Sequence, residues 1–216
     1  MLKESDENAK FDLFQRLNTG GSQLSPQEVR NCLLVMLNPE MYTWLKKLAA
    51  YESFQECIAL SDRPLDEAYD VELALRFIVF SRISDSDLSK GVGDVGDFLT
   101  ERMKELATQP RFPRTRYEAD FKKTFDVLYK VVGADAFKRY STKKHRHEGG
   151  FLLSQYEVVA LGIAHNLSQL PTEAEIKTRI QKIWGDRNYT DWAGSGITAT
   201  RRLPHLIPLG RALFAK

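Results

Sequence analysis

The residues of this sequence best suited to bind a ligand lie in one short stretch, FQRLNTGGSQLSPQE at 14–28. Arg16 offers a planar guanidinium that can form paired hydrogen bonds with a phosphate, and Asn18 offers a directional amide. The next three residues are Thr19, Gly20 and Gly21. Glycine backbones reach the conformations in which successive N–H groups enclose an anion. The stretch therefore has the chemistry of a phosphate-binding loop.

Two elements would position this loop. Residues 6–17 carry apolar side chains at helical spacing and predict a short helix before it. After the loop, Ser25 is followed by Pro26 and then by Glu28, which is the pattern of a capping box at a helix start. The partial positive charge of that helix start would help to hold an anion. The same residues also suit a plain corner, because glycine commonly ends a helix.

The rest of the chain also has the helical period, with apolar residues recurring every three and four positions. The runs at 70–82 and 155–166 are apolar nearly all round, which is typical of central buried elements. The run at 70–82 suits a buried helix or a buried strand, and a helix is favoured because no hairpin partner flanks it. The run at 155–166 predicts a second central helix. Further helices are expected over 26–38, 40–50, 52–60, 94–107, 118–132 and 135–140. No alternating strand pattern is present. The sequence therefore predicts one all-α domain of about nine to twelve helices.

Two more helix starts are predicted from capping boxes. Ser154 stands three residues before Glu157, and Thr172 stands three residues before Glu175. In such a box the hydroxyl accepts a backbone N–H, and the acidic side chain accepts the N–H of the capping residue. We expect both pairs to begin helices.

The charge is unevenly distributed, although the net charge of the 216 residues is only +2. Residues 111–146 contain eleven lysines and arginines against four acidic residues, and residues 176–216 contain eight against two. Residues 51–75 contain seven acidic residues and one arginine. These segments predict basic faces and one acidic face. The favoured interpretation of these charged segments is solvated helix surface, and the alternative is that they dock a partner.

Several function classes lack their residue patterns. Cys32 and Cys57 lie in apolar-periodic stretches and predict buried thiols in a reducing compartment. The nearby pair His145 and His147 lies in a basic run that opposes metal binding, so no metal site is expected. No signal peptide or run of eighteen apolar residues is present. We therefore expect a cytoplasmic protein without contact with the membrane.

Residues 14–31, FQRLNTGGSQLSPQEVRN, resemble a signature of the GmrSD-type restriction endonuclease N-terminal domain family. Members of that family carry a ParB-like domain followed by a helical region. The family pattern is Phe-x-Arg-x-Asn, then Thr-Gly-Gly, then Leu-Ser/Thr-x-x-Glu-Ile/Val-Arg-Asn at a helix start. The matching residues are Phe14, Arg16, Asn18, Thr19, Gly20, Gly21, Leu24, Ser25, Glu28, Val29, Arg30 and Asn31. The segments 149–166 and 194–214 also resemble the helical tail of some members.

The resemblance implies nucleotide-dependent cleavage of foreign DNA in defence, with a nucleoside triphosphate and a divalent metal bound by the complete protein. It makes Arg16 and Asn18 the catalytic residues. The nucleotide-binding or phosphate-binding residues that it implies are Thr19, Gly20 and Gly21.

A second family motif, Asp-Gly-x-Gln-Arg, is absent from these 216 residues, and so is an HNH-type nuclease domain. The resemblance therefore implies that residues 1–38 are the end of a truncated ParB-like domain and that residues 39–216 form its helical domain. The chain is then expected to bind no cofactor and to be inactive alone, because an upstream chain or domain would supply the missing motif. The alternative is a non-catalytic helical module that binds a protein, DNA or a second copy of itself.

Basic and aromatic residues near the C-terminus are candidates for nucleic-acid contact. IWGDRNYTDW at 183–192 places three aromatic rings around Arg187, and such rings either stack on bases or anchor a core. Arg201 and Arg202 follow the sequence GSGITAT, which resembles a phosphate turn before a helix. We take Arg187, Arg201 and Arg202 as the candidate nucleic-acid-binding residues.

Overall fold

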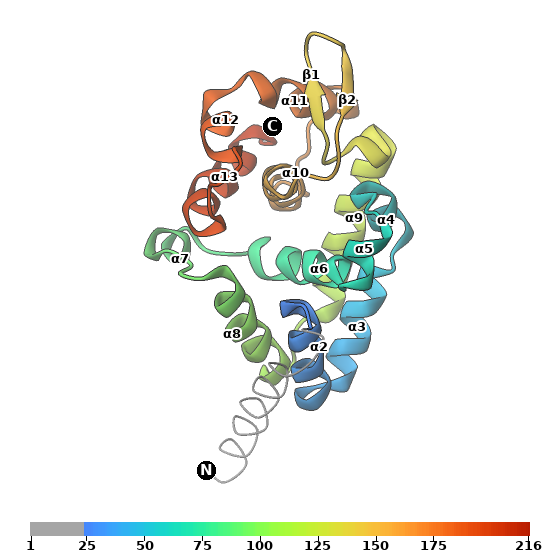
Figure 1. Ribbon diagram of the computed structural model, residues 1–216, viewed down its shortest axis with the longest axis vertical. Helices are drawn as coiled ribbons and strands as arrows, with labels where there is room; N and C mark the ends of the chain where they lie inside the picture. The colour runs from blue at the N-terminus through green and yellow to red at the C-terminus, as the bar shows by residue number, and fades with distance from the viewer. Residues whose placement is uncertain (1–23) are drawn as a thin grey trace.

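The computed structural model describes residues 24–216, and this part of the chain is all-α as predicted (Figure 1). It contains twelve α-helices, within the expected range, and one small sheet of two strands. The helix expected at 6–17 lies outside the described residues.

The first eight described helices run from one end of the molecule to its middle. They are α2 (Pro26–Leu37), α3 (Pro39–Ala49), α4 (Glu52–Ile58), α5 (Asp62–Asp66), α6 (Tyr69–Phe80), α7 (Asp85–Lys90), α8 (Val95–Thr108) and α9 (Arg114–Val132). The later elements are the strands β1 (Arg139–Ser141) and β2 (Arg146–Glu148), and the helices α10 (Leu153–His165), α11 (Glu173–Lys182), α12 (Arg187–Ala193) and α13 (Ala199–Leu213). Short 3-10 turns at Gly133–Asp135 and Ile183–Gly185 join α9 to β1 and α11 to α12.

The two runs that are apolar all round form the centre of the fold, as expected. They become α6 and α10, and α10 contacts α6, α9, α12 and α13. Figure 1 shows α10 nearly end-on between α13 and α9, with α6 crossing beside it. A cluster of aromatic rings fills the space between α4, α6, α9 and α10: Phe54, Phe77, Phe121, Phe125, Phe137 and Tyr156. These rings are fully buried and hold the two ends of the molecule together.

Helices α10 and α13 meet at two glycines. A Cβ atom on Gly210 would lie 2.2 Å from the carbonyl oxygen of Val158, and one on Gly162 would lie 2.4 Å from the carbonyl oxygen of Gly210. Only glycine lets the two backbones approach this closely. The close approach fixes the position of α13, which carries the arginines at 201, 202 and 211.

Two local predictions are wrong. Residues 135–140 do not form an α-helix, because a 3-10 turn ends at Asp135 and the chain then enters β1, which pairs with β2 in an antiparallel hairpin, with Tyr140 opposite His147. Ser154 does not cap α10, which begins after Leu152. The Ser154 hydroxyl instead contacts the hydroxyl of Tyr189, and Glu157 forms a buried ion pair described below. The capping boxes at Ser25 and Thr172 are present as predicted.

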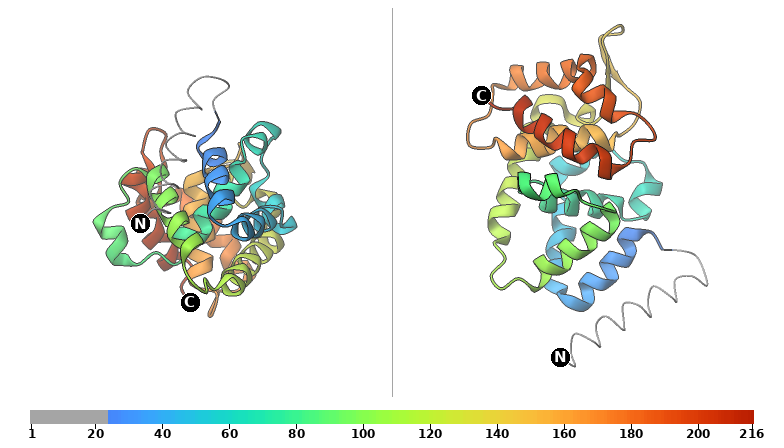
Figure 2. Two further views of the ribbon diagram at one scale, coloured as in Figure 1. Left: turned by 90° about the horizontal axis from the view of Figure 1, so that it is seen from below. Right: turned by 90° about the vertical axis from the view of Figure 1, so that its left-hand side faces the viewer.

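Helix α2 belongs to the same core as the helices that follow it. Its Leu33 and Leu34 are buried with residues of α3, α6 and α8. Figure 2 shows α2 lying alongside α8. No helix within residues 24–216 is long and apolar enough to cross a membrane. Cys57 is buried as predicted and burial raises the pKa of its thiol to about 12, whereas Cys32 is partly exposed.

Candidate functional site

The predicted loop itself lies outside the described residues. This holds for both predicted catalytic residues, Arg16 and Asn18, and for the predicted phosphate-binding residues Thr19, Gly20 and Gly21. Their roles stay predictions. The structure does show the end of the motif, from Leu24 through the first turns of α2.

The start of α2 is fastened at its cap. The Ser25 hydroxyl accepts the backbone N–H of Glu28 at 3.2 Å, and the Glu28 carboxylate accepts the backbone N–H of Ser25 at 2.7 Å. The same hydroxyl donates to the carbonyl oxygen of Glu67 at 2.8 Å, which ties the cap to the end of α5. The chain that follows the predicted loop therefore enters the helical body at a defined point.

A second contact, made by Arg30, links α2 to the interior of the helical body. This motif residue has only 4% of its side chain exposed, and its guanidinium contacts the Glu72 carboxylate of α6 at 2.6 Å. Gln27 accepts a hydrogen bond from Arg30 Nε at 2.8 Å. Burial lowers the pKa of Arg30, and the charge of Glu72 opposes that shift. A buried guanidinium is stable only with such a partner, so α2 and α6 are linked by a charge pair that is costly to separate.

The pair is one end of a network that crosses the molecule. Glu72 also contacts Arg76 at 2.8 Å, and Arg76 Nη1 lies 3.9 Å from the carboxylate of Glu157 on α10. Glu157 in turn binds Arg202 of α13 through two hydrogen bonds, at 2.6 and 2.9 Å. Burial raises the pKa of Glu157, and the contacts with Arg202 oppose that shift. The network connects α2, α6, α10 and α13.

The three arginines predicted to contact nucleic acid are placed differently. Arg202 is engaged by Glu157 and by the carbonyl oxygen of Ile197, so its donors face the protein. Arg187, at the start of α12, and Arg201, on α13, are exposed and make no side-chain hydrogen bond or ion pair with the described residues. Their binding roles stay predictions, and the contacts of Arg202 give it a structural role.

The aromatic residues around Arg187 mostly anchor the fold. Tyr189 is fully buried, and Trp184 packs against it edge to face while donating to the side chain of Gln155. Trp192 stacks on His205, with 3.6 Å between the ring centroids. The core interpretation of these rings therefore fits better than base stacking.

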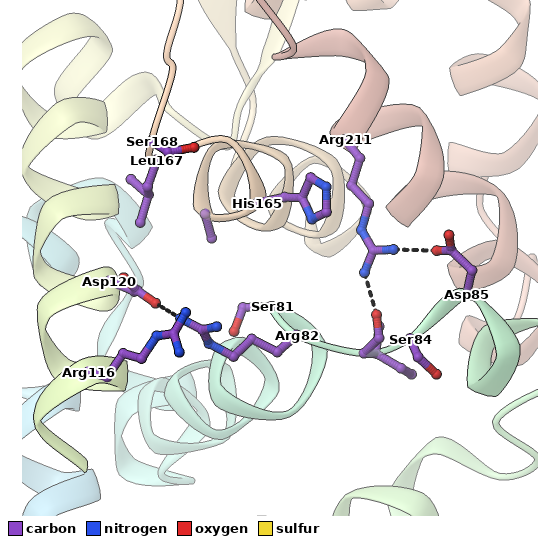
Figure 3. Close-up of a pocket in the computed structure, with 12 residues that line it drawn as sticks. Ser81, Arg82, Ser84, Asp85, Arg116, Asp120, His165, Leu167, Ser168 and Arg211 are labelled. Atoms are coloured by element: carbon purple, nitrogen blue, oxygen red, sulfur yellow. Dashed lines mark hydrogen bonds and ion pairs between the residues drawn. The ribbon is translucent and has the colours of Figure 1, made fainter. Parts of the chain in front are cut away.

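The structure also contains a cleft beside the ends of the two central helices, α6 and α10 (Figure 3). The sequence patterns do not predict this cleft. It has a volume of about 560 Å³ and lies between the end of α6, the side of α9, the end of α10 and α13. We call it the arginine cleft, after three of its lining residues, which are Arg82, Arg116 and Arg211. Figure 3 shows Arg82 and Arg116 near Asp120, with His165 and Arg211 on the facing side.

Two of these arginines are held by partners. Arg82 forms an ion pair with Asp120 and lies over the ring of Tyr117, with 5.2 Å to its centroid. Arg211 pairs with Asp85 and donates to the carbonyl oxygen of Ile83. These contacts hold both guanidinium groups in place at the walls of the cleft.

Two further groups are less constrained. The side chain of Arg116 is exposed and has no hydrogen bond or ion pair with the described residues. Partial burial and the charge of Arg211 lower the pKa of His165, which favours its neutral ring. The cleft thus presents one uncompensated positive charge and a ring that can donate a hydrogen bond.

No family model matches this chain, and comparisons with curated proteins and with solved structures find no match. The GmrSD-like character of the chain therefore remains a prediction from residues 14–31.

The cleft residues have no local signature, so the sequence alone does not predict the cleft. Arg82 and His165 follow apolar runs and look like ordinary helix ends, whereas Arg116 lies in the basic stretch RFPRTRY. Arg211 is separated from Arg82 by 129 positions in the sequence. The packing of α6 and α10 against α9, and of α13 against α10, brings these side chains to one cleft.

Proposed function

We propose that this chain is the helical C-terminal portion of a GmrSD-like, nucleotide-dependent defence nuclease of the cytoplasm. In this proposal it contributes one wall of a nucleotide site and is inactive alone. The wall consists of Arg16, Asn18 and the Thr-Gly-Gly turn that follows them. The observation that supports the proposal is the attachment of α2, because residues that match the family pattern at 25, 28 and 30 fasten this helix to the body.

The attachment gives the helical body a mechanical role. A loop that ends at a capped helix has one end held in place. The loop therefore loses less conformational entropy when it closes on a phosphate. Arg16 would offset phosphate charge, and Asn18 would orient a phosphate oxygen or a metal-bound water. An upstream domain or chain that carries Asp-Gly-x-Gln-Arg would supply the other wall. At this site, a nucleoside triphosphate and a divalent metal would bind only when both walls are present.

The test is restriction of phage or plasmid DNA in cells that carry the complete locus. We expect Arg16→Ala and Asn18→Ala to abolish protection while the protein accumulates normally. Two matched cap variants test the attachment. Ser25→Ala and Thr172→Ala each remove one capping box, but only the first lies beside the loop. We expect Ser25→Ala to weaken protection and Thr172→Ala to leave it unchanged.

Full protection in cells with both Arg16→Ala and Asn18→Ala would overturn the proposal. A fall in protection with Thr172→Ala as large as with Ser25→Ala would show that only stability is being measured.

A second function, a non-catalytic interaction module, has its own supporting observation. The tip of the β1–β2 hairpin exposes four basic side chains: Lys143, Lys144, His145 and Arg146. Helices α4 and α5, with the residue that follows α5, expose five acidic ones: Glu52, Glu56, Asp62, Asp66 and Glu67. These two faces have the charges needed for docking a protein, DNA or a second copy. Stable co-purification with a partner, together with harmless Arg16→Ala and Asn18→Ala variants, would favour this function.

A further inference from the structure

We propose that the arginine cleft binds a phosphate group carried by a nucleoside, either a free nucleotide or the end of a nucleic-acid strand. This site is separate from the predicted loop at 14–21. It is formed wholly by described residues of α6, α9, α10 and α13 and the segments next to them.

The cleft contains polar groups that the protein itself does not use. Arg116 is unpaired among the described residues, and its guanidinium lies in the same cleft as that of Arg82. Arg82 uses Nη2 for Asp120, which leaves its Nε and Nη1 without a hydrogen-bond partner in the described chain. Ser81 is only 8% exposed, lines the cleft, and has no side-chain hydrogen bond within residues 24–216. Solvent reaches these groups through the cleft, so their donors are available to a ligand.

The charge of the cleft favours an anion. Asp120 is paired with Arg82 and Asp85 with Arg211, so the charge of Arg116 is left uncompensated. Two guanidinium groups that line one cleft repel each other, and a bound phosphate relieves that repulsion while accepting their N–H groups. Arginine matches phosphate oxygens with its planar set of donors.

The shape of the cleft indicates what the phosphate is attached to. A second cavity of about 440 Å³ shares Asp85, His165 and Arg211 with the arginine cleft. Its apolar lining is formed by Leu88, Pro204, Pro208 and Ala212. Together the two cavities offer a charged end and an apolar end, joined at His165 and Arg211. A nucleoside phosphate has this combination, with a charged group at one end and a flat ring at the other.

The decisive experiment is titration calorimetry of the 216-residue chain with three probes. They are inorganic phosphate, adenosine 5′-monophosphate and a short 5′-phosphorylated single-stranded DNA. We expect at least one of the two nucleoside probes to bind more tightly than inorganic phosphate, because it also fills the apolar cavity. Preference for the mononucleotide or for the strand then distinguishes the two sources of the phosphate.

The variants are chosen to fold. Arg116→Ala removes an exposed, unpaired side chain, and we expect it to weaken binding by about ten-fold to a hundred-fold, the loss of a charged hydrogen bond. Ser168→Asp adds a negative charge at the exposed rim and should also weaken binding. Arg187→Ala is the matched control, since the Arg187 side chain is also exposed and unpaired among the described residues but lies on α12 outside the cleft.

The proposal is overturned if neither nucleoside probe binds, or if binding survives Arg116→Ala and Ser168→Asp unchanged. Its outcome is independent of the proposed function. Arg16→Ala should leave binding at the cleft intact, whereas Arg116→Ala should leave the predicted loop intact.

Discussion

At the scale of single residues, the main feature is the charge network buried between four helices. It contains three arginines and two glutamates, and its members are Arg30, Glu72, Arg76, Glu157 and Arg202. Arg76 Nη1 is buried and has no hydrogen-bond partner among the described residues. Removing one partner of such a set leaves the others without compensation in a medium of low polarity. The network is therefore the most sensitive polar part of the described chain.

We predict that Glu157→Gln lowers the free energy of unfolding by about 3–5 kcal/mol, the usual cost of breaking a buried ion pair. The amide keeps the size of the side chain but leaves the charge of Arg202 uncompensated. Urea unfolding followed by circular dichroism measures the change. Glu173→Gln is the matched control, because Glu173 pairs with Lys130 at an exposed site. We expect this variant to lower the free energy of unfolding by less than about 1 kcal/mol. Equal losses in both variants would show that burial does not decide the effect.

A second prediction at this scale concerns pH. Lys122 donates to Glu118 at 2.6 Å and Trp44 donates at 3.1 Å, and these contacts lower the pKa of Glu118. A carboxyl whose pKa is lowered by folding stabilises the protein above its unfolded pKa, near 4.5. That contribution is lost as the pH falls through the folded pKa.

We therefore expect Glu118→Gln to reduce the loss of stability between pH 5 and pH 3 by up to about 1 kcal/mol, since the site is partly exposed. Urea midpoints at each pH, read from tryptophan fluorescence, give this slope. Lys122→Met should reduce the slope in part, because the contact with Lys122 is the largest cause of the shift. A slope unchanged in both variants would contradict the assigned contacts.

At the scale of elements, the crossing of α10 and α13 determines the shape of the C-terminal half. Gly210→Ala should lower stability by about 1–3 kcal/mol or more, because the new methyl group would lie against the carbonyl oxygen of Val158 and force the helices apart. Thermal unfolding measures the change. Gly150→Ala is the control, since a Cβ atom there would contact nothing within 4 Å. A Gly210→Ala protein as stable as the wild type would show that the helices do not cross this closely.

The elements also show what the sequence could and could not predict. The helix starts at Ser25 and Thr172 are local features, decided by a hydroxyl and a carboxylate three residues apart, and they were predicted correctly. Ser154 and Glu157 have the same spacing but form no capping box, because the Glu157 carboxylate pairs with Arg202 of α13 instead. The hairpin at β1–β2 was missed because it is short and its strands are too polar to alternate.

At the scale of the whole molecule, the all-α class and the two central helices were predictable, because helical periodicity and all-round apolarity are properties of the chain itself. The arginine cleft was not predictable, because it depends on which helix ends meet. Arg116, His165 and Arg211 lie on three different helices, and Arg82 lies in the turn after a fourth. Each looks like an ordinary surface residue until the fold brings them together.

The proposed function depends on one physical claim, that α2 is part of the helical body and holds one end of the loop before it. Hydrogen–deuterium exchange of the 216-residue chain tests this claim directly. We predict that amides of the last two turns of α2 exchange as slowly as those of the exposed side of α9, because Leu33, Leu34 and Arg30 are buried. Exchange of α2 as fast as that of the hairpin tip at 142–145 would contradict the claim.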